Sequence, residues 1–94
     1  MDILLTTLCT QVQIAEMLHD SLAPLLETGN IGPLELSAAV FGRLAANAWH
    51  LLMCLIAAGD PAAGVALQAF RRARAGEARA VSHMRSLASV AMAA

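Results

Sequence analysis

The sequence predicts an all-α fold: a three-helix up-down-up bundle with a long central helix, assembled into an oligomer. Three observations predict it. Most of the apolar residues are Ala and Leu, which are strong helix formers. Apolar positions recur at helical spacing in three successive segments, whereas no segment alternates as a strand would. Glycine and proline fall between these segments, at 29–33 and 59–61.

The composition provides more apolar surface than a small bundle can hide. The chain has 94 residues, so we expect one domain over 1–94. Apolar residues make up 59% of it and charged residues 14%, against roughly 45–50% and 25% in ordinary soluble domains. A chain of this size buries only about 60–65% of its unfolded surface. The surplus should be covered by another copy, by a partner protein or by a lipid-like surface.

The first helix is expected over about 3–28. Its apolar positions have a heptad-like spacing, and His19 occupies the one place in the series that is not apolar. The apolar members are Leu5, Leu8, Val12, Ala15, Leu22 and Leu26. Pro24 lies within this pattern and lacks the amide hydrogen that a helix needs. We therefore expect a kink near Pro24, or a short separate turn over 22–28.

The second helix is expected over 33–58, after a linker that contains Gly29, Asn30 and Gly32. Pro33 takes the favoured first helical position. The repeating positions are Leu34, Ser37, Phe41, Leu44, Ala48, Leu51 and Leu55. Polar residues are scarce on this helix, so it should be buried on several sides and form the centre of the bundle.

Three adjacent residues predict the next boundary. Gly59 suits a left-handed helix stop, Asp60 an N-cap and Pro61 the first helical residue. The third helix is expected over 61–90 and carries five arginines. Gly64 and Gly76 each lower its intrinsic stability by about 1 kcal/mol relative to Ala, and such small residues permit close approach of a neighbouring helix.

Charges are sorted along the chain. Residues 1–40 carry five acids and no base, whereas 41–94 carry six Arg against Asp60 and Glu77. We favour pairing of the acidic first helix with the arginine-rich last helix. The alternatives are a solvated cationic face, head-to-tail association of copies, and contact with a membrane or nucleic acid. The last helix lacks the interfacial anchors Trp and Lys, which argues against contact with a membrane. The chain has few aromatics and a net charge of −1, so we expect no nucleic-acid partner.

We expect no enzyme and no cofactor. The sequence lacks a GxSxG motif and a glycine-rich phosphate loop, and the cluster of Glu16, His19 and Asp20 is typical of a solvated helix edge. Counting from the turns places His19 and His50 at heights roughly 13 Å apart, and His50 and His83 further apart still.

The only candidate metal site is a cluster of Cys9, His50 and Cys54, since His50 and Cys54 are i,i+4 neighbours and Cys9 should lie level with them. A metal- or haem-binding helical protein is therefore the remote alternative. Residues of these types on apolar helices are more often packing residues. The two cysteines are predicted to be buried free thiols of a cytoplasmic protein.

The sequence also predicts a cytoplasmic location without a transmembrane span. The N-terminal stretch lacks the basic region of a signal peptide. The longest charge-free run of the central helix, 44–59, is shorter than the roughly 20 residues that cross a bilayer.

Two short motifs lie around the second turn: AAGDPAA at 57–63 and ALQAF at 66–70. This region, about 44–87, resembles the phasins, small helical proteins that coat bacterial polyhydroxyalkanoate granules. Phasins commonly have an alanine-rich helix, a short turn with Pro and an Ala- and Arg-rich helix, although they are usually longer and rich in Lys and Glu. The resemblance implies a non-enzymatic, oligomeric, granule-associated coat protein of a bacterial cytoplasm.

Our first functional hypothesis is a self-associating helical protein, phasin-like, that binds a hydrophobic surface, such as a granule, or a protein partner. The alternative is an adaptor or regulatory subunit that docks a specific protein through an exposed apolar helix face. In either case the interface is expected on apolar residues of the hairpin, namely Phe41, Leu44, Trp49, Leu51, Leu52, Leu55 and Phe70.

Overall fold

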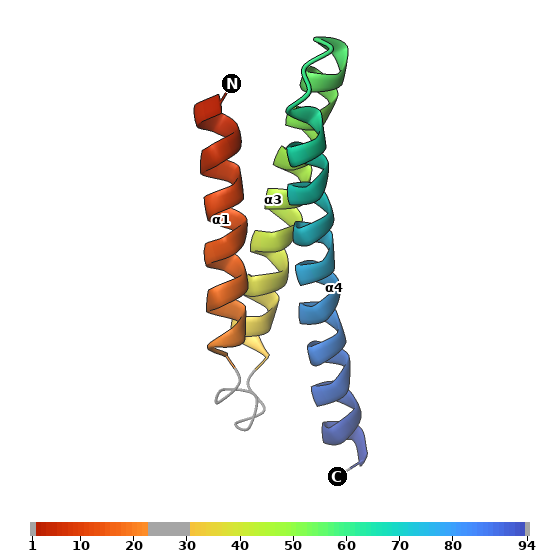
Figure 1. Cartoon of the computed structure of the whole chain (residues 1–94). Coiled ribbons are helices and arrows are strands. Elements are labelled where there is room, and N and C mark those ends of the chain that lie inside the picture. The colour runs from red at the N-terminus through yellow and green to blue at the C-terminus, as the bar shows by residue number, and fades with distance from the viewer. Residues whose placement is uncertain (1, 23–30, 94) are drawn as a thin grey trace.

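The computed structural model describes residues 2–22 and 31–93 and confirms the predicted all-α three-helix bundle, whereas the oligomer stays a prediction (Figure 1). This described part contains three helices and no strand. Helix α1 spans Asp2–Asp20, helix α3 spans Gly32–Ala57 and helix α4 spans Ala63–Ala93. α1 and α4 run in the same direction and α3 runs opposite to both. The bundle is elongated, with extents of 54 × 19 × 15 Å. The end of α4 projects beyond the other two helices, as Figure 1 shows.

α1 ends at Asp20, and the part of the predicted first helix over 23–28 lies outside the described residues. A turn at Ser21 and Leu22 ends it. The Leu22 amide donates to the His19 carbonyl at 3.0 Å, and the Ser21 hydroxyl donates to the Leu18 carbonyl at 2.7 Å. Such local side-chain bonds compete with helix continuation. The predicted kink at Pro24 and the linker at 29–30 lie outside the described residues.

The boundary between α3 and α4 falls where the sequence predicted it. Gly59 has φ +65°, in the left-handed region. The Asp60 amide donates to the Leu55 carbonyl at 2.9 Å and the Gly59 amide to the Ile56 carbonyl at 3.0 Å, which together form a Schellman motif. The Asp60 carboxylate accepts from the Ala62 amide at 2.9 Å. α4 begins at Ala63 rather than Pro61, because the chain first winds through a tighter turn in which the Ala63 amide donates to the Asp60 carbonyl.

The core combines large side chains from α1 and α3 with small ones from α4. Phe41, Leu34, Leu55 and Val12 are the largest fully buried side chains. The buried hydrophobic residues of α4 are all alanines, at positions 66, 69, 73 and 80. Because alanine occupies little volume, α4 lies close to α3 along the length of the hairpin.

The Phe41 ring of α3 lies close to the backbone of Gly76 in α4. Phe41 has no exposed surface. A Cβ atom built on Gly76 would lie 2.6 Å from Cδ1 and Cζ of the Phe41 ring, which is inside van der Waals contact. The ring therefore occupies the space that a side chain at position 76 would need. This fixes the relative height of α3 and α4.

α3 has the length and composition of a membrane-spanning helix. Its most apolar 18-residue window has a mean hydropathy of 1.4, and one third of that window is buried in the bundle. The core helix of a soluble protein meets the same criteria, and α3 supplies Leu34, Phe41 and Leu55 to this core. The absence of a transmembrane span therefore stays a prediction.

The contact between Phe41 and Gly76 predicts that Gly76→Ala destabilises the protein. Helix propensity alone favours Ala by about 1 kcal/mol, but the added methyl group displaces a buried ring, and overpacking costs about 1–3 kcal/mol. We expect the free energy of unfolding, measured by urea titration at one fixed protein concentration, to fall.

Gly64→Ala is the matched control, because a Cβ at Gly64 meets no atom within 4 Å among the described residues. This variant should be as stable as the unaltered chain or slightly more stable. Equal or increased stability of Gly76→Ala would show that the ring does not fix the hairpin.

Candidate functional site

Two ion pairs join α1 to α4. Glu16 forms a two-point interaction with Arg72, and Asp20 lies 3.8 Å from Arg79. These contacts confirm the favoured interpretation of the charge sorting. The side chains are partly or largely exposed, and pairs of this kind contribute about 0–1 kcal/mol each. They orient α1 more than they stabilise it.

His19 lies where all three helices meet and is 96% buried, since only 4% of its surface is exposed. Its Nδ1 atom is 3.1 Å from the Ser37 hydroxyl of α3. Its ring stacks on His83 of α4, with centroids 5.1 Å apart and planes 4° apart, and meets Phe41 edge-on at 6.1 Å. A histidine in an apolar seam therefore joins α1 to both other helices.

The surroundings of His19 favour its neutral form. Burial lowers its pKa below the ordinary value of 6.5, and the positive charge of Arg79 and the neighbouring His83 lower it further. Asp20 acts in the opposite direction with a smaller effect, and Ser37 and Phe41 of α3 carry no charge. The Nε2 atom of His19 and Nδ1 of His83 are buried without a hydrogen-bond partner in the described part of the chain.

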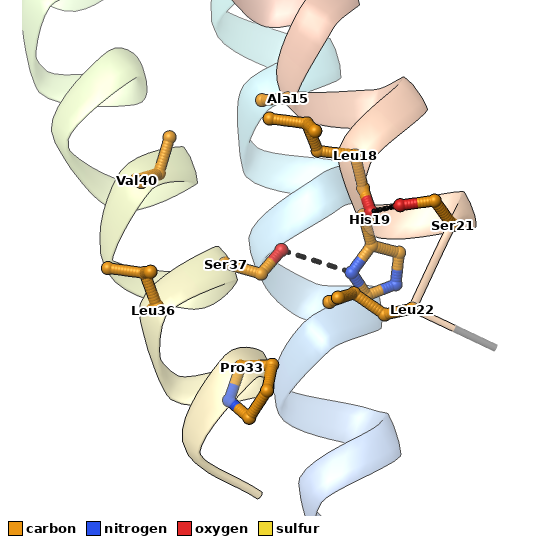
Figure 2. Close-up of a pocket in the computed structure, with 9 residues that line it drawn as sticks. All are labelled: Ala15, Leu18, His19, Ser21, Leu22, Pro33, Leu36, Ser37 and Val40. Carbon is orange, nitrogen blue, oxygen red and sulfur yellow. Dashed lines mark hydrogen bonds between the residues drawn. The ribbon is translucent and has the colours of Figure 1, made fainter. Parts of the chain in front are cut away.

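An apolar groove opens beside this histidine, between α1 and α3 (Figure 2). Its volume is about 240 Å³ and no formally charged side chain lines it. Leu18, Leu36 and Val40 form its rim and are 61%, 67% and 41% exposed. The lining residues are Ala15, Leu18, His19, Ser21, Leu22, Pro33, Leu36, Ser37 and Val40. We refer to this set as the α1–α3 groove.

Four of the predicted interface residues belong to the chain's own core. Phe41, Leu44, Leu52 and Leu55 are buried, with exposed fractions of 0–7%. They hold the three helices together and have no surface left for a partner. Leu51, also predicted for the interface, is half-buried and packs against the core.

The other two predicted interface residues, Trp49 and Phe70, lie on another face of the bundle. Trp49 of α3 and Phe70 of α4 contact each other, with ring centroids 5.3 Å apart. Trp49 is 45% exposed and Phe70 is half-buried. These residues remain accessible to a partner.

The candidate metal cluster is not assembled. The described residues contain no group of three His, Cys, Asp or Glu that could hold a metal ion. Cys9 is half-buried against the core, whereas His50 and Cys54 are exposed. The prediction that Cys54 is buried is wrong, because Leu55 takes the inward direction on this turn of α3 and the preceding residue points away.

Sequence reasoning missed the pair formed by His19 and His83. The sequence prediction compared the positions of His19 and His50 along the bundle axis, and then those of His50 and His83. It did not compare His19 with His83. In an up-down-up bundle the first and third helices run parallel, so residues of α1 and α4 can lie side by side. The residue offsets in the two ion pairs are 56 and 59, whereas His19 and His83 are 64 residues apart, so charge pairing alone does not predict the stacked histidines.

Comparison with models of known protein families, with characterised proteins and with solved structures found no match for this chain. The resemblance to phasins therefore stays a prediction. The fold and the chemistry of the exposed surfaces carry the functional argument.

The lowered pKa of His19 predicts that stability falls on acidification. The unfolded chain binds a proton at His19 more readily than the folded chain, so stability from this group is complete above about pH 6.5 and is lost as the pH falls through the lowered pKa. We expect urea titrations over this range to show a decline that is smaller in His19→Gln.

His50→Gln removes an exposed histidine from α3 and serves as the control. It should keep the pH dependence of the unaltered chain. If His19→Gln and His50→Gln decline equally, the buried histidine does not control acid stability.

Proposed function

We propose that this chain is a non-enzymatic, self-associating helical protein that binds a hydrophobic partner or surface. The observation that carries the proposal is the α1–α3 groove, whose exposed rim residues are large and apolar and whose lining has no formal charge. Exposed apolar patches of this kind on small proteins mark contact surfaces.

A second copy suits the α1–α3 groove. An apolar, uncharged groove favours an equally uncharged ridge, because a buried unpaired charge is costly. Leu18 of α1 and Leu36 of α3 present such a ridge on the groove's own rim. Two copies related by a two-fold axis bring the same patch together, so this surface is suited to self-complementary contact.

The energetic scale is consistent with reversible association. Fully burying one Leu or Val side chain contributes about 1.5–3 kcal/mol. Association of two molecules costs about 4–15 kcal/mol, because each loses translational and rotational freedom. Several rim side chains must therefore be covered at once, and one charge placed among them should shift the equilibrium strongly.

The hydrogen-bonded His19 and Ser37 do not favour a hydrolase. Ser37 lies inside the regular helix α3, whose amides are engaged in helical hydrogen bonds. A serine nucleophile also needs free donors directed at the developing oxyanion. The pair is better explained as a polar contact that orients α1.

Leu36→Glu tests the proposal, because Leu36 is 67% exposed and its substitution leaves the core intact. We expect the unaltered chain to sediment above its monomer mass of 9.8 kDa, and Leu36→Glu to weaken association at least about tenfold. Sedimentation velocity over a range of concentrations measures both.

Thr10→Glu is the control, since Thr10 is exposed on α1 and does not line the groove. It should associate as the unaltered chain does, and circular dichroism should show equal helix content in both variants. A monomeric unaltered chain at all concentrations, or unchanged association of Leu36→Glu, would contradict the proposal. A stoichiometric complex of monomeric chain with one other protein would instead favour the adaptor alternative.

A further inference from the structure

The bundle has a second exposed apolar surface, on the side where α3 and α4 meet away from the groove. Trp49, Met53 and Ile56 recur at i, i+4 and i+7, so they share one face of α3, and they are 45%, 39% and 56% exposed. Phe70 of α4 packs against Trp49. A shallow hollow of about 420 Å³ lies beside these rings, and His50 and Arg74 also line it. We call Trp49, Met53, Ile56 and Phe70 the tryptophan face.

Three of the six arginines form no ion pair within the described residues. Arg72 and Arg79 pair with acids of α1, and Arg74 pairs with Glu77 at 2.8 Å. The other three arginines, Arg43, Arg71 and Arg85, are exposed and form no ion pair within the described residues.

Few acids oppose these arginines. Helical spacing places Arg85 eleven residues after Arg74, so these two arginines share one side of α4. Of the three described acids of the hairpin, Glu77 pairs with Arg74, Asp60 accepts a hydrogen bond in the turn before α4, and Glu35 forms no ion pair. The surface is therefore both apolar and cationic.

The sequence argued against membrane contact of the arginine-rich helix, because this helix has no Trp to anchor it. In the folded protein a neighbouring helix supplies that Trp. α4 has no Trp of its own, but Trp49 of α3 lies directly on Phe70 of α4. Tryptophan favours the boundary between water and lipid, and arginine can extend its charged end to the headgroups while its stem covers apolar surface. The anchor and the cations come from different helices and meet only in the folded hairpin.

We infer that the tryptophan face binds an anionic lipid surface, lying along it without crossing it. Apolar side chains and cations together supply the two contributions that interfacial binding requires. A second copy is disfavoured here, because a two-fold axis would bring like charges together.

This inference rests on the proposed function, because it states which hydrophobic surface the protein binds. The binding face is the tryptophan face and not the α1–α3 groove. Trp49 is the only Trp of the chain, so its fluorescence reports directly on the face. We expect a blue shift of its emission on addition of vesicles that contain phosphatidylglycerol. The shift should be weak with pure phosphatidylcholine vesicles and should diminish with added salt.

Two double variants test the role of the cations. Arg71→Gln with Arg85→Gln removes two unpaired arginines and should weaken partitioning by roughly fivefold per arginine. Arg72→Gln with Arg79→Gln removes the same charge from the side that faces α1, and should weaken partitioning much less. Vesicle co-sedimentation measures both, and Leu36→Glu should bind vesicles even where it fails to self-associate.

Three results would overturn the inference: no shift with anionic vesicles, equal binding to neutral vesicles, or equal loss in the two double variants. Concentration-dependent burial of Trp49 without lipid would assign this face to another copy. Burial of Trp49 by an acidic protein, with no response to vesicles, would likewise replace lipid as the ligand. Because Leu36→Glu separates the two faces, a failure here leaves the test of self-association intact.

Discussion

The contact of Phe41 with Gly76 is the constraint on which the rest of the structure depends. A fully buried ring occupies the space of an absent side chain, so α3 and α4 can pair closely at one relative height only. The same register brings Trp49 against Phe70. The alanines that line the inner face of α4 maintain the approach along the hairpin.

This close packing determines which apolar side chains stay exposed to solvent. A core built on alanine and glycine from one helix has room for few large side chains from the other two. Leu18 and Leu36 are consequently exposed although they are as apolar as the buried Leu34 and Leu55. The uncovered apolar surface is thus a consequence of the packing, and both proposed interactions would cover part of it.

Much of the architecture could be predicted from the sequence, because its signals are local. Gly59, Asp60 and Pro61 marked the turn between α3 and α4, and the segregation of acids from arginines anticipated the pairing of α1 with α4. The repeating positions of α3 predicted most of its inward face, since Leu34, Phe41, Leu44, Ala48 and Leu55 are buried. Because this helix is apolar nearly all round, the pattern did not separate core residues from residues that are free to contact a partner. Leu36 was therefore not recognised as a rim residue, and Leu44 was assigned to an interface. The stacked His19 and His83 depend on the offset of two distant helices, which no local pattern encodes.

The central claim is that assembly covers the α1–α3 groove, and hydrogen–deuterium exchange of the unaltered chain at low and high concentration tests it most directly. Peptides over 14–22 and 32–40 carry the groove, whereas 71–86 lies on α4. We expect slower exchange at high concentration in the two groove segments and little change over 71–86. Exchange that is independent of concentration throughout, or slowed only over 71–86, would contradict the claim.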